Sequence, residues 1–128
     1  MSGIGDGRLV LIVEDNERNM KLFCDILQAS GFGTLTATTG ERAVEVALEQ
    51  RPDLVLMDIQ LPGIDGVEAL GRLRADDRFA SVPVLALTAQ AMEGDRERFL
   101  SAGFDGYLSK PVDVTDFVRT VKRYCRDE

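Results

Sequence analysis

The sequence predicts an α/β fold, a doubly wound five-stranded parallel sheet with five helices. Five short apolar runs alternate with segments whose apolar residues recur at helical spacing, as in parallel sheets covered by helices on both faces. The first, third and fourth runs are nearly continuous in Val, Leu and Ile, which is typical of strands buried on both faces. At 128 residues, the chain has the length of one domain with a full core.

The apolar runs and the residues between them give the expected order of elements. The expected strands are residues 9–13, 33–37, 54–57, 84–87 and 106–108. Residues 1–8 contain three glycines and no periodicity, so we expect a flexible tail followed by a single domain over 9–128. The first four helical faces are defined by Met20, Phe23, Ile26 and Leu27, then Ala43, Val46 and Ala47, then Val67, Leu70 and Leu73, and finally Phe99 and Leu100.

The ends of the helices carry their own signals. Ser30-Gly31, Arg51-Pro52 and Gly103 are expected to end the first, second and fourth helices. The last helix has the clearest pattern and Asp113 is expected to cap its start. Its apolar face consists of Val114, Phe117, Val118, Val121, Tyr124 and Cys125. The fourth helix has the weakest apolar stripe, which suggests either a marginal helix or a surface with another purpose.

Composition excludes several classes of function. The net charge of −7 argues against a nucleic-acid-binding surface. Cys24 and Cys125 lack metal-site spacing and read as reduced thiols of a cytoplasmic protein. No apolar run exceeds five residues, so neither a signal peptide nor a membrane span is expected. The chain has no histidine, which excludes histidine-based catalysis and a phosphohistidine on the chain itself.

Polar residues follow directly after four of the expected strands. They are Glu14-Asp15-Asn16, Asp58, Thr88-Ala89 and Ser109-Lys110-Pro111. Ligands of open parallel sheets bind at the carboxyl ends of the strands, where the strand order reverses. In the flavodoxin-like order 2-1-3-4-5, the first and third strands are neighbours at that point. Three carboxylates, a hydroxyl and an ammonium are therefore expected to converge on one patch.

This combination of side chains suits metal-assisted phosphoryl transfer. Neighbouring carboxylates repel one another, and Mg²⁺ compensates them while keeping room for a phosphoryl oxygen. A carboxylate such as Asp58 can accept a phosphoryl group as an aspartyl phosphate. Phosphoryl transfer then requires mainly positioning and neutralised oxygens, which Lys110 and Thr88 can supply.

Each residue also has a simpler interpretation. Asp15 or Asn16 can cap the first helix, and Thr88 can cap the fourth. Lys110 can be an ordinary loop lysine, and Tyr107 can pack on an edge strand. Their joint placement, each at the same end of its own expected strand, favours the functional interpretation.

Four motifs resemble the receiver domain of two-component response regulators. They are "LIVEDN", "DLVLMDIQLPGIDG", "ALTAQA" and "GYLSKP", and the likeness extends from Arg8 to the end of the chain. The resemblance implies a CheY-like fold. The run "VEDNERNMKLF", "MDIQLPGIDG" and the expected lack of an output domain look most similar to DivK-type single-domain regulators of cell division and polarity.

The resemblance implies a metal site built around the phosphoacceptor. Asp58 is then the phosphoacceptor, and Asp15, Asp58 and the backbone carbonyl of Gln60 bind Mg²⁺ directly, while Glu14 helps through water. Many members of the family have aspartate in place of Glu14, a difference that affects metal affinity rather than function. Gly66 is expected to close the loop after the phosphorylation site.

The resemblance also implies a switch. Thr88 and Lys110 then contact the phosphoryl group, as does the backbone amide of Ala89, whose small side chain leaves the site open to a donor. Movement of Thr88 is coupled to the rotamer of Tyr107. The bond before Pro111 is expected to be cis and to help aim Lys110.

The function implied is a phosphorylation switch in a phosphorelay rather than an enzyme. The phosphoryl group is expected from a sensor histidine kinase, a histidine phosphotransfer protein or a small donor, with at most slow self-dephosphorylation. A downstream protein would read the face formed by the fourth helix, fifth strand and fifth helix. We expect a cytoplasmic monomer or weak dimer with no nucleic acid or membrane as partner.

Four alternative functions compete with this interpretation. A haloacid-dehalogenase-like phosphatase would need a second aspartate where Gln60 stands. A flavodoxin-like flavin binder would need a phosphate loop where "EDNERN" would repel phosphate, and a DNA-binding regulator would need residues beyond Glu128. A phosphorylation-independent scaffold remains the strongest alternative.

Gln60 and Gln90 flank the site and are expected to tune the phosphoryl lifetime.

Overall fold

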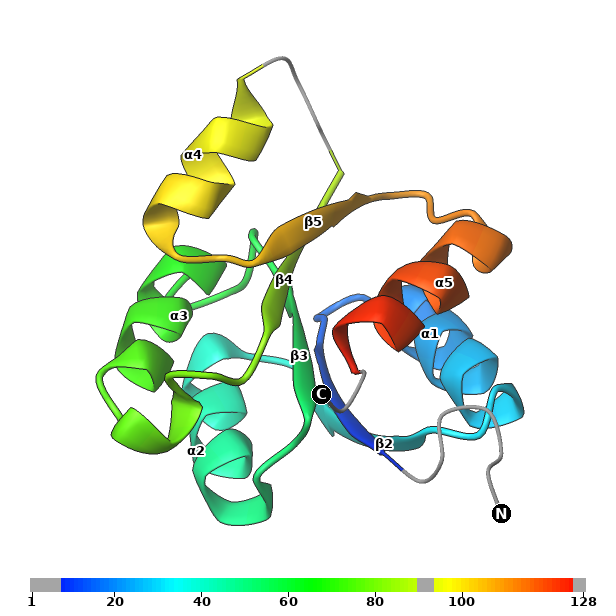
Figure 1. Ribbon diagram of the computed structural model, residues 1–128, viewed down its shortest axis with the longest axis horizontal. Helices are drawn as coiled ribbons and strands as arrows, with labels where there is room; N and C mark the ends of the chain where they lie inside the picture. Colours follow the sequence, from blue (N-terminus) through cyan, green and yellow to red (C-terminus); the bar gives the residue numbers. More distant parts are fainter. Residues whose placement is uncertain (1–7, 90–93, 126–128) are drawn as a thin grey trace.

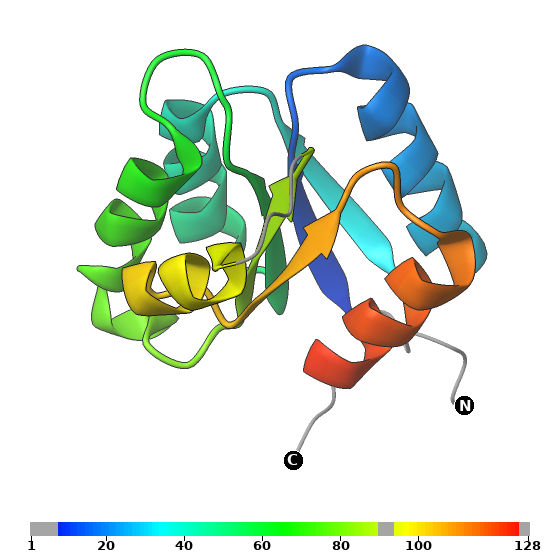
Figure 2. The same ribbon diagram turned by 90° about the horizontal axis from the view of Figure 1, so that it is seen from above.

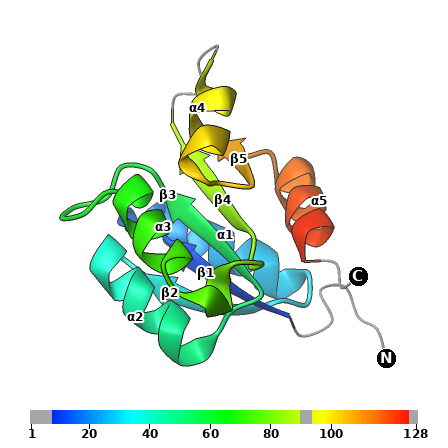
Figure 3. The same cartoon turned by 60° about the vertical axis from the view of Figure 1, so that its left-hand side comes forward.

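The structure is a three-layer sandwich in which helices cover both faces of a five-stranded parallel sheet. The computed structural model describes residues 8–89 and 94–125. The strand order is β2-β1-β3-β4-β5, as the sequence predicts. Helices α2, α3 and α4 lie on one side of the sheet, and α1 and α5 lie on the other (Figures 1 and 2). Figure 3, seen from the side of α2 and α3, shows α1 behind the sheet.

The elements alternate along the chain in the expected order. In sequence they are β1 (Leu9–Val13), α1 (Glu17–Ala29), β2 (Gly33–Ala37), α2 (Gly40–Gln50), β3 (Leu54–Asp58), α3 (Gly66–Arg74), the short 3₁₀ helix η1 (Asp77–Phe79), β4 (Val84–Thr88), α4 (Asp95–Ala102), β5 (Gly106–Ser109) and α5 (Val114–Tyr124). The last three strands each extend one residue beyond the predicted apolar run. The polar residues that follow those runs are therefore part of the sheet. The tail expected at residues 1–8 lies outside the described residues except for Arg8.

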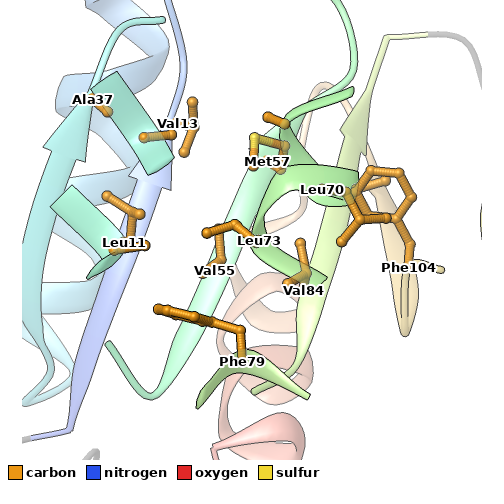
Figure 4. Close-up of a cluster of buried hydrophobic side chains, with 14 of the residues drawn as sticks. Leu11, Val13, Ala37, Val55, Met57, Leu70, Leu73, Phe79, Val84 and Phe104 are labelled. Atoms are coloured by element: carbon orange, nitrogen blue, oxygen red, sulfur yellow. The ribbon is translucent and has the colours of Figure 1, made fainter. Parts of the chain in front are cut away.

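Alternating residues of the strands supply two separate hydrophobic cores. Leu11, Val13, Val55 and Met57 point toward α2 and α3, where they meet Leu70, Leu73 and other apolar side chains (Figure 4). Val10, Ile12, Leu54 and Leu56 belong to the other core, with Phe23 of α1 and Phe117 of α5. Those two rings stack with their centroids 5.2 Å apart. The period of two residues assigns each strand position to one face of the sheet.

The helix ends agree with the sequence signals. Asn16 caps α1 and Asp113 caps α5, each through a side-chain oxygen that accepts a backbone N–H three residues later. Ser30 ends α1, and Arg51 and Gly103 end α2 and α4 in the left-handed conformation. Thr88 does not cap α4, because that helix begins at Asp95 after Gly94.

Three residues assigned to helical core faces are exposed instead. Val67 and Val114 lie in the first turns of α3 and α5, where the helix has not yet packed fully onto the sheet. In α4, Phe99 is the buried aromatic residue, and the adjacent Leu100 turns outward. This eight-residue helix thus rests on the domain through a narrow contact, in agreement with its weak apolar stripe. None of the helices in the described ranges is long and apolar enough to cross a membrane.

Candidate functional site

The register of the sheet brings the polar strand ends to one edge. Glu14 follows β1 and donates its backbone N–H to Ala37 O, so β1 and β2 remain paired to this point. Asp58 ends β3 and is paired in register with Leu87 of β4. The Lys110 N–H donates to Thr88 O at 2.7 Å, which holds the end of β5 against β4. The predicted residues therefore meet where the first, third, fourth and fifth strands end.

Three carboxylates gather at this edge. One oxygen each of Glu14, Asp15 and Asp58 lies within 4.8 Å of the others. Glu14 is 1% exposed and Asp58 is 5% exposed, whereas Asp15 is open to solvent. Glu14 and Asp58 continue the alternation of the core shared with α1 and α5, so both carboxylates point to the same side of the sheet.

Lys110 is the cation of the cluster. Its Nζ donates a hydrogen bond to Asp58 Oδ2 at 2.9 Å and forms an ion pair with Glu14 Oε1 at 2.8 Å. Burial alone would lower the pKa of Lys110, but the two carboxylates outweigh burial and raise it. The ammonium group is therefore charged at neutral pH and faces both buried acids.

The buried carboxylates of Glu14 and Asp58 can bind a further positive charge. Burial raises the pKa of Glu14, and the nearby Asp58 carboxylate adds to that effect, while Lys110 and the Asn16 N–H oppose it. Oε2 of Glu14 accepts the Asn16 N–H at 3.1 Å, but Oε1 has no well-directed hydrogen bond among the described residues. Oδ1 of Asp58 accepts the Gln60 N–H at 2.9 Å.

A divalent cation fits this arrangement. Lys110 pairs with two of the three carboxylates, and Oε1 of the buried Glu14 has no well-directed hydrogen bond within the described part of the chain. Hard cations such as Mg²⁺ prefer carboxylate, carbonyl and water oxygens, all of which this edge can present. The residues that the sequence indicates as ligands, Glu14, Asp15, Asp58 and Gln60, all line the same cavity.

The cavity has a volume of about 610 Å³ and is open to solvent. The buried residues Glu14, Asp58 and Thr88 line it, together with Lys110 and Ala89. The structure therefore brings together every residue predicted for metal binding and for contact with a phosphoryl group.

Tyr107 lies on the other face of the sheet. It packs against the core shared with α2 and α3, and its ring lies 5.9 Å from that of Phe99 in α4. Thr88 follows the strand positions of the same core, as Val84 and Ala86 do, although it also lines the cavity. Thr88 thus lines the cavity and lies on the same face of the sheet as Tyr107. Tyr107, on the neighbouring strand β5, connects this face to Phe99 of α4.

The loop after Asp58 depends on a close backbone approach. Gly66 donates its N–H to Ile59 O at 3.1 Å. A Cβ atom on Gly66 would overlap the carbonyl oxygen of Asp58 and lie 3.0 Å from the Ile59 Cα atom. The glycine therefore lets α3 begin directly against the end of β3.

Sequence reasoning missed part of the cavity wall. Asn16, Asn19 and Pro111 line the cavity, although the sequence indicated Asn16 only as a helix cap. Asn19 stands three residues after the helix cap Asn16, a spacing of about one helical turn that could have revealed it. The Lys110-Pro111 peptide bond is cis, as the resemblance implies. Gln90 lies outside the described residues.

Comparison with known proteins gives relatives along nearly the whole chain. Residues 10–122 match the response regulator receiver domain family. The polar-differentiation response regulator DivK of Brucella anthropi is 50% identical over 118 residues, which are 92% of this chain and 96% of the relative. The protein of the same description from Brucella ovis is 48% identical over the same shares of the two chains.

Solved structures agree with the fold. A receiver domain of a sensor histidine kinase from Pseudomonas aeruginosa, solved with magnesium coordinated in the active-site cleft, is 39% identical with a TM-score of 0.86, covering 93% of this chain and 98% of that one. The chemotaxis response regulator CheY4 of Vibrio cholerae is 25% identical with a TM-score of 0.87, covering 92% and 98%. With a family match across most of its length and this shared architecture, the chain belongs to the response regulator receiver domain family.

Proposed function

We propose that this chain is a Mg²⁺-dependent phosphorylation switch and that Asp58 is its phosphoacceptor. The observation that supports this most strongly is the contact between Lys110 Nζ and Asp58 Oδ2, at 2.9 Å, beside two further carboxylates. An isolated strand-end aspartate needs no such surroundings. A carboxylate nucleophile that must receive a dianionic phosphoryl group needs both a cation and a metal site beside it.

Asp58 acts as the nucleophile through one carboxylate oxygen. This oxygen attacks the phosphorus atom of the donor, forms a P–O bond, and the bond from phosphorus to the leaving group breaks. The Gln60 N–H, which donates to Oδ1 at 2.9 Å, fixes the rotation of the carboxylate during the attack. Because the cavity is open to solvent above Asp58, a donor can approach in line.

Lys110 and the end of β4 stabilise the transferred group. The Lys110 ammonium neutralises a phosphoryl oxygen, and its present partner Asp58 is the residue that carries the new charge. The Thr88 hydroxyl and the Ala89 N–H are in the same cavity and donate to the remaining oxygens. Glu14, Asp15, Asp58 and the Gln60 carbonyl would hold Mg²⁺, which when bound neutralises charge on the phosphoryl oxygens.

The signal leaves the site through the opposite face of the sheet. Thr88 moves toward the phosphoryl group, Tyr107 takes the vacated space, and the change reaches Phe99 of α4 through the ring contact. Partners then distinguish the two states on the face of α4, β5 and α5. Those partners are a histidine kinase or phosphotransfer protein upstream and a second protein downstream, in the cytoplasm, in control of cell division or polarity as the DivK name suggests.

The experiment is intact mass spectrometry after incubation with acetyl phosphate, with and without Mg²⁺. The wild type is expected to gain one phosphoryl group only with Mg²⁺, whereas Asp58→Asn gains none. Lys110→Ala is expected to be phosphorylated more slowly and to lose phosphorylation-dependent partner binding. Asp53→Asn is the matched control, since Asp53 precedes the same strand at the other edge of the sheet, where its carboxylate accepts the Leu9 N–H.

A phosphorylation-independent scaffold predicts different results. It would bind its partners equally well as wild type, as Asp58→Asn and after incubation with acetyl phosphate. Equal phosphorylation of Asp58→Asn and the wild type would likewise contradict the proposal, because it would place the phosphoryl group on another residue.

A further inference from the structure

The "EDNERN" segment places two asparagines in the cavity, and the proposed chemistry above uses neither side chain. Asn16 follows the metal-binding carboxylates, and Asn19 lies one helical turn further along α1. These are the two asparagines of the chain, and both line the same cavity as Asp58 and Lys110. Their place in the site calls for a role that a neutral amide can perform.

The two amides are engaged differently. Oδ1 of Asn16 accepts the Asn19 N–H at 2.9 Å and thereby caps α1. The side-chain amide of Asn19 has no hydrogen-bond partner within residues 8–89 and 94–125. It is half-buried, so it lies at the wall of the cavity rather than in bulk solvent. Asn19 therefore offers both a donor and an acceptor to a molecule that enters the cavity.

The geometry of in-line attack determines which part of the phosphoryl donor faces the solvent side of the cavity. The nucleophile Asp58 is buried, whereas the cavity is open to solvent, so the leaving group must point away from Asp58 and toward solvent. Asp15 and Asn19 line the same cavity and are more exposed than Asp58, which makes them candidates for contact with the leaving group. A phosphoryl donor is an anion, and among these acidic groups a neutral amide is a better neighbour for it than a further carboxylate.

We propose that Asn19 is a donor-binding residue whose side-chain amide contacts the leaving group of the phosphoryl donor. This inference rests on the proposed phosphorylation of Asp58. With acetyl phosphate, the P–O bond to the acetyl group breaks, acetate departs with the electron pair, and the amide N–H donates to its oxygen. With phosphoramidate, the P–N bond breaks, ammonia departs with the electron pair, and the amide oxygen accepts one of its N–H groups.

The test compares these two small donors, because their leaving groups differ in charge. Asn19→Asp keeps the shape of the side chain but replaces the N–H donor with a negative charge. That charge repels the departing acetate and attracts the protonated nitrogen of phosphoramidate. The ratio of the phosphorylation rates with acetyl phosphate and with phosphoramidate, at saturating Mg²⁺, is therefore expected to fall about fivefold, the upper range for an exposed charge pair.

Two features of the design separate a contact with the donor from a general effect. Arg18→Gln makes the net charge more negative by the same one unit at the neighbouring exposed position, and it should leave the ratio within about twofold of the wild type. A structural defect or weaker Mg²⁺ binding in Asn19→Asp would slow both donors alike and leave the ratio unchanged. Aspartate in the first turn of α1 is favourable for the helix, so this variant should fold.

The outcomes distinguish this inference from the proposed function. A lower ratio in Asn19→Asp with an unchanged ratio in Arg18→Gln supports the contact with the leaving group. An unchanged ratio in Asn19→Asp, in a wild type that both donors phosphorylate at Asp58, overturns this inference alone. If neither donor phosphorylates the wild type in the presence of Mg²⁺, both the proposed function and this inference are overturned.

Discussion

Replacement of Gly66 by alanine tests how tightly the end of β3 is held. The new Cβ would overlap the Asp58 carbonyl oxygen and approach the Ile59 Cα to 3.0 Å. Both contacts are with backbone atoms, which cannot rotate away as a flexible side chain can. The start of α3 or the end of β3 must therefore shift, and the hydrogen bond from Gly66 to Ile59 weakens.

The expected cost follows from the size of this clash. Overpacking by a single methyl group in a close-packed region typically costs about 1–3 kcal/mol, and a backbone obstacle places Gly66→Ala toward the upper end. Gly71 is the matched control, because it lies in the same helix and a Cβ there would meet no described atom within 4 Å. Gly71→Ala should increase the free energy of unfolding by about 0.5–1 kcal/mol, since glycine is a poor helix former.

Urea denaturation at 25 °C measures both free energies of unfolding against the wild type. The free energy of unfolding should change in opposite directions for these two identical substitutions, which lie five residues apart in one helix. If Gly66→Ala were as stable as the wild type, the close approach of α3 to Asp58 would be wrong. The geometry of the loop after the proposed phosphorylation site would then need revision.

Three further predictions concern stability. Arg74 donates to the carbonyls of Phe79, Val82 and Gly103 and to the Asp105 carboxylate. Arg74→Ala should therefore lower the free energy of unfolding by about 2–4 kcal/mol in urea denaturation. Arg72→Ala, which breaks an exposed pair with Glu68, should change it by less than about 1 kcal/mol, and equal losses in the two variants would refute the role assigned to Arg74. Asp113→Ala should cost about 1 kcal/mol through loss of the α5 cap, while Asp113→Ser should retain most of it, and a loss as large in the serine variant would argue against capping. Burial raises the pKa of the Cys125 thiol to about 11 from its usual 9.0, so between these values the thiol stays protonated in the folded chain and ionises in the unfolded chain. The free energy of unfolding should therefore decline by about 1–2 kcal/mol more between pH 9 and pH 11 in the wild type than in Cys125→Ala. Parallel pH profiles for the two proteins would contradict this.

The fold could be predicted from the sequence because the three central strands, β1, β3 and β4, are buried on both faces. A continuous apolar run such as the one that begins at Leu54 has few alternatives to a buried strand in a chain of this size. Each run also ends at a polar residue, and in β3, β4 and β5 that residue is the last one of the strand. The same feature that bounds the strands therefore locates the site.

The exposure of individual side chains could not be predicted from the sequence, because it depends on how the helices pack onto the sheet. Val67 and Val114 fit an apolar stripe by spacing, but their positions in first turns leave them exposed. Spacing also could not show that the Asn19 amide lines the cavity without a hydrogen-bond partner among the described residues, since that depends on how α1 packs beside β1. The roles assigned to Asp58, Lys110, Thr88 and Tyr107 remain predictions, which phosphorylation experiments test.

The most direct test of the central claim is to locate the phosphoryl group itself. Reduction of the phosphorylated chain with borohydride converts an aspartyl phosphate to homoserine, which peptide mass spectrometry assigns to one position. If Asp58 is the phosphoacceptor, homoserine is expected at position 58, only in samples incubated with both donor and Mg²⁺. Homoserine at position 15 instead, or at no position in a phosphorylated sample, would contradict the assignment of Asp58 as the phosphoacceptor.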